Sequence, residues 1–142
     1  MIKKLLFLCS ILFSINAQSQ IVIDNTAPYN NNTYLIDSVL LGGGVTATSH
    51  SFQGNSSQIA WFDGSNSNVG IDTGIVLSSG NIVDIVGPNN LGGTSTLFNP
   101  VFGISTTGDP TLDLIVAPDD TYDAAVLEFD FIPTSDTLKF QY

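Results

Sequence analysis

The chain has 142 residues and a formal net charge of −10, from 3 Lys and Arg against 13 Asp and Glu. Charged residues make up only 11% of the chain and hydrophobic residues 43%, so the acidity reflects a scarcity of bases. This is not the composition of a disordered polyanion. An acidic surface also repels nucleic acid, so no nucleic-acid partner is expected. The length corresponds to a single domain.

The N-terminus has the pattern of a secretory signal peptide, predicted over residues 1–19. A basic start at residues 1–4 precedes an apolar run over 5–15, and small and polar residues follow. Cleavage after Ala17 or Ser19 fits the small-residue requirement. The apolar run is shorter than the roughly 20 residues that cross a bilayer, so no transmembrane segment is predicted.

Removal of this segment takes basic side chains and the cysteine out of the mature chain. It takes away Lys3, Lys4 and Cys9, the only cysteine, so no disulfide can form in the exported chain. Lys139 is then the single base against thirteen acids, a net charge of −12. A lipid anchor on Cys9 is not expected, because Leu8 precedes it where a small residue is needed.

The first predicted elements are a short strand and a helix. Residues 21–23 are apolar and predict a strand. Apolar residues then recur at helical spacing and predict a helix over 34–41, with Thr33 as its N-cap. The glycines at 42–44 mark its end.

Beyond the glycines the apolar pattern changes to alternation, which is typical of strands. Strands are predicted over 45–50, 58–62 and 74–78, separated by loops at 63–72 and 87–108. The second loop is too long to be structureless in a compact domain. Its apolar residues are therefore expected to pack on the core, namely Leu97, Phe98 and residues 101–104.

The last part of the chain predicts an antiparallel hairpin. In residues 125–131 apolar side chains alternate with Glu128 and Asp130; a turn at 133–136 and a second alternating stretch at 138–142 follow. The fold class predicted is mainly β, an antiparallel β-sandwich or jelly-roll-like domain with one or two short helices. Because the sequence stops within the second strand's pattern, the domain over 20–142 is expected to be truncated at its C-terminus.

Catalytic groups are few, and no enzyme activity is predicted. His50 is the only imidazole, and Ser51 beside it in a strand would point to the opposite face, so the two cannot act as base and nucleophile. Glu128 and Asp130 would share one strand face, as the two acids of a glycosidase do. Alternating acids opposite an apolar face are also the ordinary solvent side of an antiparallel strand, and this interpretation is preferred.

Calcium is the best-supported of the chemical hypotheses, because loop carboxylates and amides supply the oxygen ligands it needs. One polar cluster lies in the first long loop: Asp63, Ser65, Asn66, Asn68 and Asp72. A second, with denser carboxylates, is the preferred candidate: Asp109, Asp113, Asp119, Asp120 and Asp123. Asp and Asn also favour turns for local backbone reasons, so a structural role stays open for both clusters. No other cofactor is predicted.

Four aromatic residues form another candidate site. They could stack against a sugar ring, although a single Trp within an alternating strand is more often part of a core. They are Tyr29, Tyr34, Trp61 and Phe62.

Four blocks of sequence, Leu35–Val45, Val69–Gly80, Gly87–Asn89 and Asp123–Pro133, resemble the choice-of-anchor L domain family. The blocks follow the family's order. The resemblance implies an extracellular domain of bacterial surface and secreted proteins, mainly from Bacteroidetes, whose members carry varied C-terminal anchors, among them type IX secretion sorting domains. It implies no catalytic residues. In the family the last strand usually continues into further β structure and an anchor, which supports the expectation of a truncated domain.

These observations together predict a non-enzymatic secreted or cell-surface β-domain with an adhesive, binding or structural role. The alternative is a calcium-dependent carbohydrate-binding or glycan-active module. A surface glycan or another extracellular protein is the expected partner, and a downstream anchor or sorting domain is expected beyond this chain.

Overall fold

The structure is a computed structural model that describes residues 20–42, 44–87, 108–134, 136, 139 and 142. These residues form five strands in two small antiparallel sheets, with two short α-helices and three further helical segments. The expectation of a strand-rich antiparallel fold is therefore confirmed. A jelly roll has about eight strands in two sheets, and the described strands close no barrel. The predicted signal peptide, residues 1–19, lies outside the described residues.

The larger sheet has three strands in the order β1-β3-β4. β1 is Val22–Asp24, β3 is Ile59–Asp63 and β4 is Thr73–Leu77. Each strand runs antiparallel to its neighbour, with β3 in the centre. All three agree with the predicted strands to within two residues at each end.

The smaller sheet is a long ribbon of two strands, β2 (Val45–Gln53) and β5 (Val126–Pro133). They pair antiparallel along their length, and the register shifts between Thr48 and Ser51, where Ser49 has a positive φ of 55°. One extra residue in one strand is the mark of a β-bulge. β2 ends at Gln53, three residues beyond the predicted end of the strand at residue 50.

The predicted C-terminal hairpin corresponds in part to β5. Its first strand exists as β5, with Glu128 and Asp130 exposed as predicted, but the partner of β5 in the structure is β2. Most of the second predicted strand lies outside the described residues, as do Leu97, Phe98 and residues 101–104.

The predicted helix over 34–41 begins earlier than expected. It consists of a short α-helical turn, α2 (Asn32–Tyr34), that continues into a π-helical segment, η1 (Leu35–Leu40). The prediction of Thr33 as N-cap is wrong, because Asn31 holds that place and its Oδ1 accepts a hydrogen bond from the Tyr34 N–H at 3.1 Å. Asn is among the strongest N-capping residues, so the earlier of two possible caps is used.

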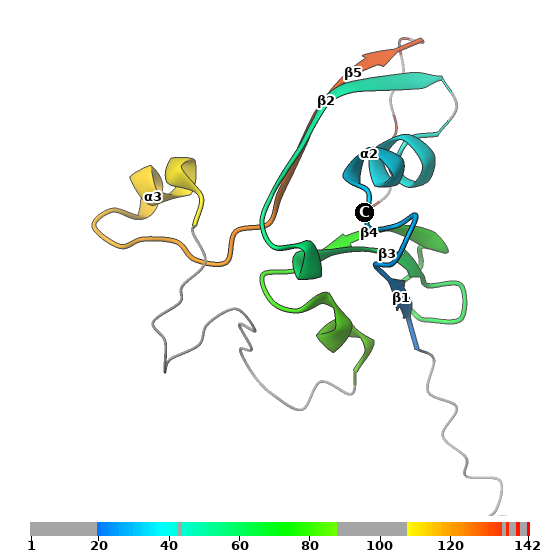
Figure 1. The fold of residues 1–142 in the computed structure, drawn as a ribbon, viewed down its shortest axis with the longest axis horizontal. Helices are drawn as coiled ribbons and strands as arrows, with labels where there is room; N and C mark the ends of the chain where they lie inside the picture. Colours follow the sequence, from blue (N-terminus) through cyan, green and yellow to red (C-terminus); the bar gives the residue numbers. More distant parts are fainter. Residues whose placement is uncertain (1–19, 43, 88–107, 135, 137–138, 140–141) are drawn as a thin grey trace, which may run out of the picture.

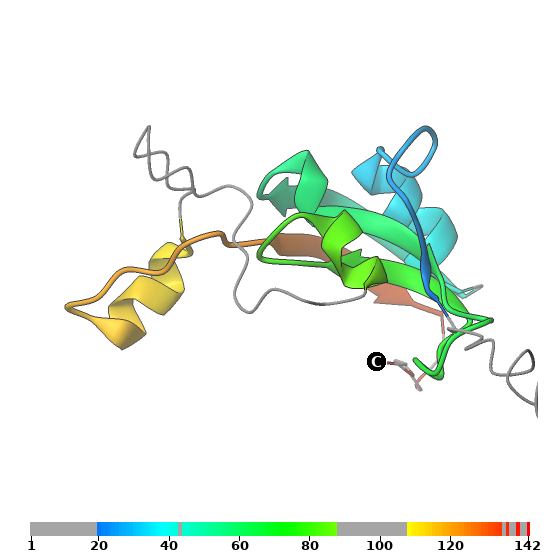
Figure 2. The same cartoon turned by 90° about the horizontal axis from the view of Figure 1, so that it is seen from below.

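The core lies between the two sheets, around η1. This segment contacts β2 on one side and β3 and β4 on the other, as Figures 1 and 2 show. The 3₁₀-helical segment η3 (Ile82–Val86) contacts β1. The buried apolar side chains come from these central elements: Leu35, Ile36, Ile59, Ala60, Phe62 and Ile82.

One helix stands apart from both sheets. This is α3 (Pro110–Val116), at the end of the molecule away from β1, β3 and β4 (Figures 1 and 2). It was not predicted from the sequence, where its residues were assigned to the second acidic cluster.

Candidate functional site

The second acidic cluster forms a single loop that contains α3, and we call residues 109–123 the acidic loop. Asp109 is the N-cap of α3: its Oδ1 accepts hydrogen bonds from the Thr111 N–H at 2.8 Å and the Leu112 N–H at 3.0 Å. Pro110 occupies the first helical turn, where a missing N–H costs nothing. This Asp-Pro pair was the signal for a helix start that the sequence-based interpretation missed.

Thr121 closes the loop on itself. The Asp113 Oδ1 accepts hydrogen bonds from the Thr121 N–H at 2.6 Å and from the Thr121 hydroxyl at 2.5 Å. The Asp109 N–H donates to the same hydroxyl at 2.9 Å. Both bonds from Thr121 lower the pKa of Asp113, and the bond from the hydroxyl has the larger effect. Side chains of the loop therefore tie its two halves together.

Two glutamine side chains hold the ends of the loop: Gln53 binds Gly108, directly before it, and Gln58 binds Asp123, its last residue. The Gln53 Nε2, at the end of β2, donates to the Gly108 carbonyl at 3.1 Å. The Gln58 Nε2 donates to the Asp123 carbonyl at 3.1 Å, and its Oε1 accepts from the Asn55 N–H at 2.6 Å. Gln58 is fully buried and ends the 3₁₀-helical segment η2 (Ser56–Gln58). The sequence predicts Gln58 as the first residue of a strand. In the structure it precedes that strand, and its side chain binds the backbone at the end of the loop.

The structure places the five predicted calcium ligands in different settings. Asp109 and Asp113 accept hydrogen bonds within the loop, whereas Asp119 and Asp120 are exposed after α3. Asp123 is half-buried at the base, where its φ of 56° is left-handed. Among the described residues no three His, Cys, Asp or Glu side chains form a group that could hold a metal ion. Calcium binding by these five residues stays a prediction.

The loop also presents apolar side chains to solvent, which the sequence-based interpretation missed. Leu114 is 82% exposed and Ile115 is 75% exposed. Their neighbours on α3 and Tyr122 at the base are exposed as well: Leu112, Val116 and Tyr122. Exposed apolar residues that cluster on one element often mark interaction sites. The signal in the sequence was the apolar run over residues 114–117, which ends at Pro118.

The first acidic cluster is the loop between β3 and β4. The Asp63 Oδ1 accepts hydrogen bonds from the Ser65 N–H at 2.9 Å and from the Ser65 hydroxyl at 2.6 Å. Both bonds lower the pKa of Asp63, and the bond from the hydroxyl has the larger effect. The Gly64 N–H donates to the Asp72 carbonyl at 2.9 Å and continues the strand pairing into the loop. The local turn role left open for this cluster therefore accounts for Asp63.

The aromatic candidates are brought together in part. Tyr29 stacks on Trp61, with ring centroids 4.8 Å apart and an interplanar angle of 15°, and Tyr34 meets Tyr29 edge-on at 5.9 Å. The Trp61 Nε1 donates to the Thr73 hydroxyl at 2.7 Å. Phe62 points to the other face of β3 and is buried. Three of the four residues therefore form a partly exposed cluster on one face of the sheet.

His50 makes a side-chain contact that links two elements. Its Nε2 lies 2.9 Å from the Asp37 Oδ1, which joins β2 to η1, and the His50 side chain is 16% exposed. Ser51 instead lies opposite Glu128 in the β2–β5 pairing. This arrangement agrees with the prediction that His50 and Ser51 do not form a base and nucleophile.

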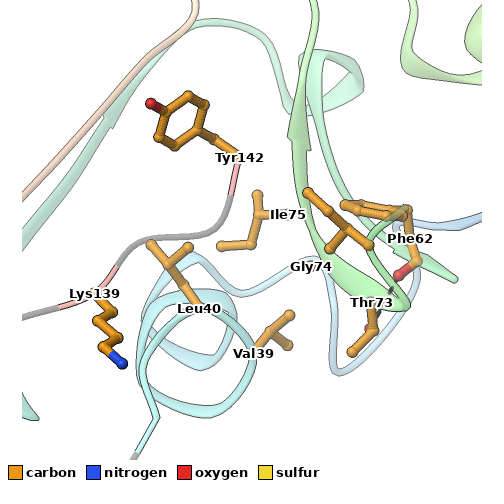
Figure 3. Close-up of a pocket in the computed structure, with 9 residues that line it drawn as sticks. Val39, Leu40, Phe62, Thr73, Gly74, Ile75, Lys139 and Tyr142 are labelled. Atoms are coloured by element: carbon orange, nitrogen blue, oxygen red, sulfur yellow. Dashed lines mark hydrogen bonds between the residues drawn. The ribbon is translucent and has the colours of Figure 1, made fainter. Parts of the chain in front are cut away.

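A cavity of about 630 Å³ lies between η1 and β4. Figure 3 shows Val39 and Leu40 of η1 facing Ile75 of β4. Lys139 and Tyr142 also line the cavity. Most of the described lining residues are apolar, and among them Lys139 has the one charged side chain.

No helix among the described residues is long and apolar enough to cross a membrane. No curated protein and no solved structure shows a significant match to this chain. One family model does match, that of the choice-of-anchor L domain, and the match runs over residues 22–142. It extends across both sheets and the acidic loop, and it confirms the resemblance seen in the four sequence blocks. The chain belongs to the choice-of-anchor L domain family.

Proposed function

We propose that this chain is a non-enzymatic domain of a secreted or cell-surface protein, with an adhesive, binding or structural role. The observation that carries the proposal is the family match over residues 22–142, because choice-of-anchor L implies a domain of surface or anchored proteins. The predicted signal peptide at 1–19 supports the same assignment. A surface glycan or another extracellular protein is the proposed partner class.

The placement of the polar residues supports a role without catalysis. His50 is engaged by Asp37, and Glu128 and Asp130 are exposed on the β2–β5 ribbon. Acids that alternate along an exposed strand face are the ordinary solvent side of an antiparallel strand.

A turnover assay tests this proposal. The exported protein is incubated with a panel of glycans and peptides, and no hydrolysis above the background of a mock preparation is expected. Glu128→Gln and, as the matched control on the same strand face, Asp130→Asn should behave like the parent. Robust turnover by the parent that is abolished by Glu128→Gln would refute the proposal.

A second candidate function is a calcium-dependent carbohydrate-binding or glycan-active module. It is supported by the stacked pair of Tyr29 and Trp61 beside Tyr34, because aromatic faces stack well against apolar faces of sugar rings. A glycan array with calcium or with a chelator tests it, together with Tyr34→Ala. Array binding that depends on calcium and on Tyr34 would favour this function over the first.

The route of export belongs to the proposal as well. The signal peptide takes the chain across the inner membrane, and a C-terminal anchor or type IX sorting domain downstream fixes its final location. Sequencing the reading frame beyond Tyr142 tests the second step directly. A downstream catalytic domain, with no anchor or sorting domain, would contradict it.

A further inference from the structure

The acidic loop combines three properties. It is closed internally by Thr121, it is attached at both ends through Gln53 and Gln58, and it holds Leu114 and Ile115 out to solvent. These hydrogen bonds hold the backbone of the loop, and with it the positions from which Leu114 and Ile115 project. Binding by such a preorganised surface loses less conformational entropy than binding by a flexible segment.

The charges around the apolar residues define what can bind there. Asp119 and Asp120 are exposed directly after α3, and the loop contains no base. A bilayer with anionic lipids would be repelled by these carboxylates. A second copy of this chain would bring the same carboxylates to the contact. A protein surface with bases around an apolar groove would instead complement both features.

We propose that the acidic loop is a docking surface for a protein partner that offers an apolar groove bordered by Lys and Arg side chains. Leu114 and Ile115 enter the groove, and Asp119 and Asp120 pair with the bordering bases. This inference rests on the proposed binding role of the domain and names the chemistry of the partner for it. Apolar anchors surrounded by complementary charges are the usual composition of a specific interface.

A synthetic amphipathic helix of Leu and Lys provides the probe, because it offers an apolar stripe between cationic borders. Its binding to the exported full chain is measured by calorimetry at two salt concentrations. Two further peptides separate the contributions: a Leu/Glu helix keeps the apolar stripe and reverses the charge, and a Gln/Lys helix keeps the charge and removes the stripe. We expect the Leu/Lys helix to bind at least tenfold more tightly than either.

Variants of the loop and matched controls elsewhere locate the site. Leu114→Ser with Ile115→Ser should weaken binding at least tenfold, and Asp119→Asn with Asp120→Asn should weaken it several-fold and reduce its dependence on salt. The controls are Val69→Ser and Asp72→Asn in the loop between β3 and β4, where Val69 is 53% exposed and Asp72 is also exposed. Each control should change the affinity less than twofold.

Three results would overturn the inference. The first is binding by the Leu114 and Ile115 variant within twofold of the parent while circular dichroism shows it folded. The second is an equal loss of binding in the Val69 control. The third is tighter binding to zwitterionic phosphatidylcholine vesicles than to the Leu/Lys helix, which would assign the loop to a lipid surface. A failure here leaves the proposed function intact, because that proposal is tested separately by the turnover and glycan assays.

Discussion

Gln58 joins the base of the acidic loop to the core, and its replacement by Ala should destabilise the whole domain. The fully buried side chain makes two hydrogen bonds, one with the Asn55 N–H at 2.6 Å and one with the Asp123 carbonyl at 3.1 Å. Loss of two such bonds costs about 1–3 kcal/mol. The space left by a buried side chain adds about 1 kcal/mol, because the surroundings relax only in part. We therefore expect the free energy of unfolding to fall by about 2–4 kcal/mol.

Urea unfolding followed by circular dichroism measures this loss. With a slope of about 1–3 kcal/mol per molar urea, the midpoint should fall by roughly 1–2 M. Gln58→Leu fills most of the space but leaves both partners unpaired, and it should still lose about 1–3 kcal/mol. Gln53→Ala is the matched control: it removes one exposed hydrogen bond, to the Gly108 carbonyl, and should cost about 1 kcal/mol or less. A stability of Gln58→Ala within about 0.5 kcal/mol of the parent would refute the reasoning.

Two further predictions concern the closure of the acidic loop. The pKa of Asp113 is lowered in the fold, so its contribution to stability is present above 3.8, the ordinary pKa of an Asp side chain, and is lost as the pH falls through the lower folded pKa. Thr121→Val removes the hydroxyl bond, so the urea midpoint should fall less between pH 5 and pH 2.5 than in the parent, and an equal fall would contradict the assignment. A Cβ on Gly108 would collide with the backbone carbonyl of Thr121, whereas one on Gly42 would meet no atom within 4 Å. Gly108→Ala should therefore lower the free energy of unfolding by about 1–3 kcal/mol, and a thermal melt in which Gly42→Ala loses as much would contradict this difference.

The elements that follow a regular apolar period were predictable, and those defined by side-chain hydrogen bonds were not. The helix around Leu35 and Ile36 and the strands β3 and β4 show their period in the sequence, because each buries one continuous face. Thr33 and Asn31 are both good N-caps, and the sequence does not say which one the backbone uses. Likewise, the alternation in β5 indicates a strand but does not identify β2 as its partner, because pairing is a long-range property.

The candidate site shows the same division. Five acids close together in sequence predict cation ligands, and the structure adds hydrogen-bonding roles for two of them: Asp109 caps α3, and Asp113 accepts from the N–H and the hydroxyl of Thr121. The exposed apolar side chains of α3 were not recognised, since an apolar run in a sequence is ordinarily assigned to the core. Exposure of such a run can only be seen once the packing of the rest of the chain is known.

The most direct test of the central claim, that this chain is an exported surface domain, is the state of the protein in the cells that make it. N-terminal sequencing of the protein, combined with protease treatment of intact cells, reads both its processing and its location. The account predicts a mature N-terminus at Gln18 or Gln20, following cleavage after Ala17 or Ser19, and a domain that is degraded by external protease or found in the medium. A protein that keeps residues 1–19 and is protected inside intact cells would contradict it.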